Sequence, residues 1–206
     1  MPEGYPARPS LRSGISGQPH NHDEAGNWQP RRLPAEADRL CREIRAPERL
    51  VRHLRLVHDA AASLLEELTR AFPTLSVDAR AVLIGAAVHD LGKALHPEEL
   101  SGPGNLHERD GPALLERHGL EPSLARFART HGGCDSEPVE PEDLLVCLAD
   151  RLWRGVRDNR LEGRIVQVLA DRCGIEAWEA FERFDRIAER VASGAESRLA
   201  WQAAVD

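Results

Sequence analysis

The chain has 206 residues, of which 41% are hydrophobic and 30% charged, a composition typical of one globular domain. Its formal net charge of −7 argues against an extended nucleic-acid surface, because proteins with such a surface are usually basic. The chain contains no run of about 18 apolar residues, so the sequence predicts no membrane span.

The first part of the chain differs in composition from the rest. Residues 1–33 are rich in Pro, Gly, Ser and Asn and show no helical or strand periodicity, which predicts a disordered tail. Residues 34–206 are expected to form a single domain.

From residue 34 onward, apolar residues recur at helical spacing. The clearest stripe includes Leu50, Leu54 and Val57, at intervals of three and four residues. Pro73 is expected to end that helix and Asp78 to cap the next one. No strand is predicted. The seven or eight expected helices, with a single turn at 97–100, cover about 35–45, 47–71, 78–90, 105–118, 122–131, 141–154, 160–173 and 175–203.

The four cysteines indicate no disulfide framework. They are Cys41, Cys134, Cys147 and Cys173, and no two of them form a CxxC pair. The first residues also lack a charged-then-apolar targeting pattern. We therefore expect reduced thiols in a cytoplasmic protein.

Six side chains that can bind a metal fall on apolar helix faces or at helix ends. Taken singly, a histidine on such a face is more often a hydrogen-bonded core residue, and an aspartate more often a cap or the partner of an arginine. The combination is what indicates a site. The six are His53, His89, Asp90, His107, His131 and Asp150.

The two aspartates of this set call for a cation. Asp90 and Asp150 are flanked by apolar residues, and an unpaired buried carboxylate is costly. Imidazole nitrogens together with carboxylate oxygens suit a transition metal better than calcium. We expect one or two divalent transition-metal ions, with iron or manganese favoured and zinc, cobalt, nickel or magnesium as alternatives.

The order of these residues resembles the HD-domain superfamily of metal-dependent phosphohydrolases. The matching segments lie within about 47–155 and are RHLRLVHDAA, GAAVHDLGK, NLHERDG, FARTHGG and LADRLW. The resemblance implies an all-α helical bundle with a five-helix metal-binding core, followed by extra C-terminal helices at about 158–203. No GYP element follows, which argues against the cyclic dinucleotide specificity of the HD-GYP branch.

The resemblance also implies how the ligands are shared. Histidines between the two aspartates are what the two-metal branches add, among them bacterial HD-type diadenosine tetraphosphate hydrolases. Two neighbouring cations lower the pKa of a shared water, so the expected reaction is hydrolysis of a nucleotide or another small phosphate ester or anhydride. One metal would be held by His53, His89, Asp90 and Asp150, and Asp90 would bridge to a second held by His107 and His131.

Lys93 is the single lysine beside 26 arginines, and it follows Asp90 by three residues. Gly92 is expected to let the chain bend sharply here. A compact ammonium can then reach a phosphate oxygen at the metal rim, where a planar guanidinium is bulkier. In the HD-GYP branch the lysine of HDxGK has this role, so Asp90 and Lys93 are interpreted as catalytic and Lys93 also as substrate-binding. The alternative is a lysine retained by drift.

Two arginines are further candidates for binding an anionic substrate. Arg151 directly follows Asp150, and Arg109 lies in the NLHERDG segment. The run Arg151, Arg154 and Arg157 has the alternative interpretation of a solvated face paired with acidic residues.

Three histidines of the helical region are not assigned to the metal site. His58 is expected to point off the apolar stripe, and His118 to interact with the dipole at a helix end. His96 follows Lys93 closely and carries only a weak indication of substrate contact.

Two further functions fit the same residues. Some proteins with the HD fold are di-iron oxygenases with the same ligand pattern. The identity of the metal and a dependence of the reaction on oxygen would distinguish an oxygenase from a hydrolase. A non-catalytic nucleotide sensor would bind without turnover, although such a protein has no need of six ligands. The sequence does not identify the small phosphorylated substrate.

Overall fold

The computed structural model describes residues 21–22, 28–134 and 140–204. This part of the chain is all-α, apart from one antiparallel pair of two-residue strands, β1 (Asn21–His22) and β2 (Trp28–Gln29). The helices are α1 (Ala35–Ile44), α2 (Glu48–Ala71), α3 (Ala79–Val88), α4 (Leu106–Arg117), α5 (Pro122–Ala125), α6 (Phe127–Thr130), α7 (Pro141–Leu152), α8 (Asn159–Cys173), α9 (Ala177–Ser193) and α10 (Ala195–Ala203), with 3₁₀ turns η1 (Leu91–Ala94) and η2 (Pro97–Leu100).

The all-α prediction is confirmed, and the helices differ from expectation mainly in their divisions. The segment expected as one helix at 122–131 contains α5 and α6, which meet at Arg126. The long C-terminal helix is divided at Gly194 into α9 and α10. The turn expected at 97–100 is η2.

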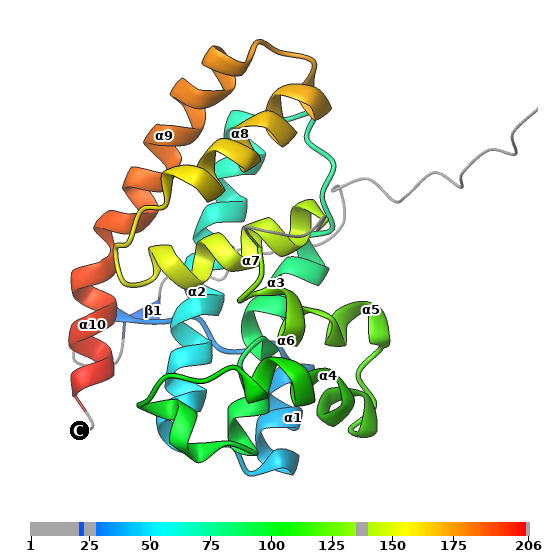
Figure 1. Cartoon of the computed structure of the whole chain (residues 1–206). Coiled ribbons are helices and arrows are strands. Elements are labelled where there is room, and N and C mark those ends of the chain that lie inside the picture. The colour runs from blue at the N-terminus through cyan, green and yellow to red at the C-terminus, as the bar shows by residue number, and fades with distance from the viewer. Residues whose placement is uncertain (1–20, 23–27, 135–139, 205–206) are drawn as a thin grey trace, which may run out of the picture.

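Helix α2 is the central element of the bundle. Pro47 precedes its first turn, and Pro73 follows soon after its end, where a proline cannot continue the helix. Leu54 and Val57 are fully buried, and the helix packs against α3, α7 and α9 (Figure 1). No helix in the described part of the chain is long and apolar enough to cross a membrane.

The helices around α2 begin at defined caps. The Asp78 side chain accepts a hydrogen bond of 2.9 Å from the backbone N–H of Ala81 at the start of α3. Helix α7 begins with Pro141, and Glu140 and Asp143 form a reciprocal capping box there. These caps fix the starting points of two helices that carry candidate metal ligands at their far ends.

Gly92 has a different role from the one expected. It lies in η1 rather than at a sharp bend, and its backbone packs against the first turns of α4. A methyl group at Gly92 would overlap the backbone carbonyl oxygen of His107. The glycine is therefore needed because two backbones approach closely, not because the chain turns.

Residues 28–33, assigned to the tail from sequence, lie against the domain. Arg31 is 6% exposed, and its guanidinium contacts the fully buried Asp59 of α2 at 3.0 Å. Asp59 also contacts Arg198 of α10 at 3.3 Å. Arg31 and Arg198 both pair with the buried carboxylate of Asp59 in α2. The packed domain therefore includes residues from Trp28 onward. Residues 1–20 and 23–27 lie outside the described part.

Cys134 and Cys147 lie side by side, a juxtaposition that the sequence did not indicate. Their Cα atoms are 6.6 Å apart, within the range that a bridge can span. Cys134 follows α6 and Cys147 lies in α7, so the juxtaposition depends on how these helices pack. Cys41 and Cys173 are free.

Candidate metal centre

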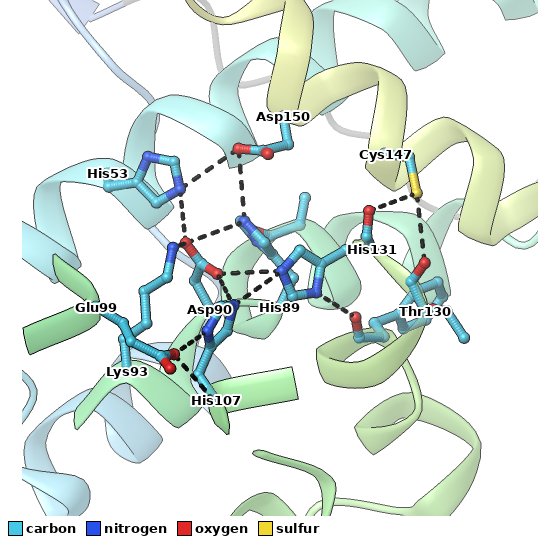
Figure 2. Close-up of polar contacts among 12 residues, drawn as sticks. His53, His89, Asp90, Lys93, Glu99, His107, Thr130, His131, Cys147 and Asp150 are labelled. Atoms are coloured by element: carbon cyan, nitrogen blue, oxygen red, sulfur yellow. Dashed lines mark hydrogen bonds and ion pairs between the residues drawn. The ribbon is translucent and has the colours of Figure 1, made fainter. Parts of the chain in front are cut away.

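The six predicted ligands converge at one place in the bundle (Figure 2). They come from segments far apart in sequence. His53 lies in α2 and Asp150 in the last turn of α7, while His107 lies in the first turn of α4. His131 follows α6 directly, and His89 and Asp90 connect the end of α3 to η1. The change from α-helix to 3₁₀ helix occurs at the two consecutive ligands.

The first group of ligands surrounds one oxygen of Asp90. Asp90 Oδ2 lies 3.2 Å from His53 Nε2 and 3.7 Å from His89 Nε2. Asp150 lies on the same side, with Oδ1 3.4 Å from His53 Nε2 and 3.6 Å from His89 Nε2. Two nitrogens and two carboxylates therefore face a common centre. We call His53, His89, Asp90 and Asp150 the first set.

The second group surrounds the other oxygen of Asp90. Asp90 Oδ1 lies 3.3 Å from His107 Nε2 and 3.2 Å from His131 Nε2. The two histidine nitrogens are 3.4 Å apart. Asp90, His107 and His131 form the second set, and Asp90 belongs to both.

The donor atoms are arranged to bind a cation rather than to hydrogen-bond with one another. Within the described residues, His89 Nε2 and Asp90 Oδ1 are buried and have no hydrogen-bond partner, although buried polar atoms normally have one. In each set, the ligand atoms of three residues lie within 4.8 Å of one another. Nitrogen and carboxylate donors of this kind fit a divalent transition metal. The cluster can therefore hold divalent metal, and the donor types leave the metal's identity open.

The rings are oriented by hydrogen bonds from their other nitrogens. His89 Nδ1 lies 3.0 Å from the carbonyl oxygen of Ala86, and His131 Nδ1 lies 3.2 Å from that of Phe127. A carbonyl oxygen only accepts, so both Nδ1 atoms carry the proton. The Nε2 lone pairs then point into the cluster, as metal ligation requires.

Glu99 is a site residue that the sequence analysis did not identify. It lies in η2, is buried, and its Oε2 is 2.5 Å from His107 Nδ1. The same carboxylate accepts the backbone N–H groups of Leu106 and His107. A sequence signal existed, since an acid shortly before a helix start often binds that helix's free N–H groups.

The charges in the cluster are strongly coupled. Burial would raise the pKa of Asp90, but the charge of His89 and the adjacent ring nitrogens of the other ligand histidines hold it well below its usual value. Burial likewise opposes ionisation of Asp150, yet His89 and His53 lower its pKa to about 2. Burial also favours neutral His89, but Asp90 and Asp150 raise its pKa. Both aspartates are therefore ionised at neutral pH.

The cluster has a buried floor and an open rim. The side chains of His89 and Asp90 are 0% and 3% exposed, whereas those of His53, Lys93 and Asp150 are 19%, 22% and 28% exposed. Solvent therefore reaches the cluster from the side of His53, Lys93 and Asp150. Lys93 Nζ lies there, 2.5 Å from Asp90 Oδ2.

The two arginines proposed as substrate contacts are paired with acids. Arg109 is largely exposed, and its Nε donates to Asp110 at 2.8 Å. Arg151 Nε lies 2.9 Å from Asp158 Oδ2. Arg157 contacts Glu162 at 2.6 Å, so this arginine is also paired with an acid, which is itself buried.

The three unassigned histidines lie outside both sets. His118 ends α4 and lies 3.4 Å from Glu43, and His96 Nε2 lies 2.9 Å from Asp110. His58 is in neither set, but it is buried, so the expectation that it lies off the apolar face of its helix is wrong. Burial lowers the pKa of His58 to about 4.

Comparison with protein families identifies the class of this fold and site. The HD domain model matches residues 37–155, which is more than half of the chain and includes all six ligands. The chain belongs to the HD domain family, whose members are typically metal-dependent phosphohydrolases. Comparisons with curated proteins and with solved structures found no match.

Proposed function

We propose that this protein is a metal-dependent phosphohydrolase that acts on a nucleotide or another small phosphate ester or anhydride. The observation that carries the proposal is the arrangement of six ligands in two sets that share Asp90. A carboxylate with one oxygen in each set is suited to bridge two cations.

Each ligand set would hold one metal ion. The residues around Asp90 Oδ2 would hold one ion and those around Asp90 Oδ1 a second. When bound, divalent metal lowers the pKa of a water molecule and neutralises charge on phosphate oxygens. The buried floor keeps His89 and Asp90 in fixed positions, so the open rim is where substrate would enter.

The charge of the site indicates that cations must bind before an anionic substrate can. With the ligand histidines neutral, as metal binding requires, the carboxylates of Asp90, Asp150 and Glu99 in or against the cluster outnumber the neighbouring ammonium of Lys93. An anionic phosphate would be repelled by this excess of negative charge. Bound metal would reverse the local charge and allow a phosphate to approach.

Lys93 is suited to contact the substrate once metal neutralises Asp90. Its ammonium lies at the rim on a flexible stem, already next to Asp90 Oδ2. An ammonium is compact and presents three donors around one atom, so it can turn from the carboxylate to a nearby phosphate oxygen. That contact would stabilise charge on the transferring phosphoryl group.

The test is phosphate release from a panel of nucleotides and phosphate monoesters. Chelator-stripped protein should be inactive, and added Mn²⁺ or Fe²⁺ should restore release that Asp90→Ala lacks. Oxygen consumption without phosphate release would instead support a di-iron oxygenase. Nucleotide binding without turnover, in metal-loaded protein, would support a sensor and overturn the proposal.

A further inference from the structure

Among the described residues, His107 is the ligand histidine whose Nδ1 contacts a carboxylate, and that carboxylate belongs to Glu99. Its Oε2 lies 2.5 Å from His107 Nδ1, whereas the corresponding nitrogens of His89 and His131 meet neutral carbonyl oxygens. A carboxylate behind a ligand histidine fixes its tautomer and raises its basicity. The proton is therefore held on Nδ1, and Nε2 is free to face Asp90 and His131.

The same carboxylate also fixes the backbone that carries His107. The N–H of Leu106 donates to Glu99 Oε1 at 2.9 Å, and the N–H of His107 donates to Oε2 at 3.1 Å. Asn105, at the N-cap position of α4, makes no side-chain cap of its own. Glu99 thus replaces the missing cap and binds both the ring and the main chain of one residue.

The surroundings hold Glu99 in this position. Its backbone N–H donates to the carbonyl oxygen of His96 at 2.9 Å, within the turn that leads into η2. Gly104 lies directly over the carboxylate, where a methyl group would overlap it. The carboxylate has little freedom to leave, because three hydrogen bonds and a close backbone enclose it.

We propose that Glu99 is the positioning residue of the second set, and that its loss selectively weakens metal binding by Asp90, His107 and His131. The inference rests on the proposed metal centre. It assigns Glu99 no contact with substrate or metal. Its effect passes through the tautomer and orientation of His107.

The experiment compares Glu99→Gln and Glu99→Ala with the wild type. Chelator-stripped protein is titrated with Mn²⁺ by calorimetry, and the thermal midpoint is recorded for each variant. Glu99→Gln keeps the size and one acceptor oxygen but loses the charge and the second acceptor, and the thermal midpoint shows whether the fold is retained. One binding event should weaken by about 10–100-fold, the usual cost of removing such a partner, while the other stays unchanged. Glu99→Ala should weaken the same event further.

The matched control is Glu98→Gln. Glu98 is the preceding residue of η2, and its side chain is 67% exposed, so its neutralisation should leave both binding events unchanged. The tautomer of His107, read by nitrogen NMR of metal-free protein at a pH where the ring is neutral, gives a second measure. Wild type should carry the proton on Nδ1, and Glu99→Gln should show a mixture of tautomers.

The outcomes separate this inference from the proposed function. A wild type that binds no Mn²⁺ would overturn the metal centre and the inference with it. A wild type with two binding events, both retained at full affinity in Glu99→Gln, would overturn the inference alone. Equal weakening of both events would also contradict it, because the positioning would then not be specific to the second set.

Discussion

Lys93 is the residue at which charge and shape can be separated by one substitution. Lys93→Arg keeps the positive charge beside Asp90, so metal content and folding should be unchanged. The guanidinium is wider, and its donors cannot converge on one oxygen at the rim. We expect phosphate release to fall, mostly in kcat, with Lys93→Ala losing about 10²–10³-fold and Lys93→Arg somewhat less. Full activity of Lys93→Arg would indicate that the lysine is retained by drift.

His58 provides a test of burial at the residue scale. Its pKa is lowered by burial to about 4, whereas an unfolded histidine titrates near about 6.5. Between these values the unfolded chain binds a proton that the folded chain does not, so stability falls as the pH falls through this window. The total loss from this residue is on the order of 3 kcal/mol.

The measurement compares the wild type with His58→Leu by urea unfolding at several pH values. The free energy of unfolding of the wild type should decline relative to the variant from about pH 6.5 to about pH 4. Metal ligands titrate in both proteins, so their contribution cancels in the difference. Parallel curves over this range would show that His58 is accessible to protons in the folded state.

The ligand residues could be predicted from sequence because their chemistry and order are visible in it. Histidines and aspartates at apolar positions, such as His53 and Asp150, indicate a site before any contact is known. Glu99 was missed because its role depends on how η2 folds back onto α4. The Cys134–Cys147 pair was missed for a related reason, since only the packing of α6 against α7 brings the two residues together.

At the scale of elements, the contact between η1 and α4 determines where His107 lies. Gly92→Ala should push the two backbones apart, because the new methyl group would overlap the His107 carbonyl. We expect a loss of about 1–3 kcal/mol in the free energy of unfolding and weaker metal binding by the second set. Denaturant unfolding and metal titration measure the two effects.

The control for Gly92 is another helical glycine. Gly163 lies in α8, and a methyl group there would meet no atom within 4 Å. Gly163→Ala should therefore stabilise the protein by up to about 1 kcal/mol through helix propensity. If the two substitutions behaved alike, the close approach at Gly92 would not be a constraint on the fold.

The amphipathic helices could be predicted, but several of their junctions could not. Helix α2 repeats apolar residues over its whole length, and proline lies just beyond both of its ends. The division at Gly194 has no such signal. There the Arg198 side chain packs against the glycine, and a methyl group added at Gly194 would lie 3.0 Å from Arg198 Nη1. Contacts between α9 and α10 decide this junction, and a single-sequence pattern does not contain them.

At the scale of the whole molecule, one buried ion cluster joins segments from both ends of the described chain. Asp59 of α2 is fully buried between Arg31 and Arg198. Removing one partner from such a cluster leaves uncompensated buried charge, so Asp59→Ala should cost about 3–5 kcal/mol. The exposed Glu43, which pairs with Arg39, is the control, and Glu43→Ala should cost far less, because a solvent-exposed ion pair contributes little.

The ion cluster of Asp59, Arg31 and Arg198 also shows why the domain extends further than its metal-binding core. Helices α9 and α10 and residues 28–33 contribute no metal ligand, yet they pack on α2. Arg52 and Arg55, which flank His53 in sequence, stack on Trp201 of α10. Thermal unfolding should show the loss in Asp59→Ala, while metal stoichiometry of the folded protein stays unchanged. Loss of metal at temperatures where Asp59→Ala remains folded would instead connect the cluster to the site.

The central claim is that two ligand sets share Asp90. The most direct test is the stoichiometry of Mn²⁺ binding to chelator-stripped protein, measured by calorimetry and checked by elemental analysis. The wild type and the control His118→Ala, whose histidine lies outside both sets, should bind one ion for each set. His131→Ala should retain the first set alone, and Asp90→Ala should lose both. Binding by Asp90→Ala equal to that of the wild type, or no binding by the wild type, would contradict the shared-carboxylate site.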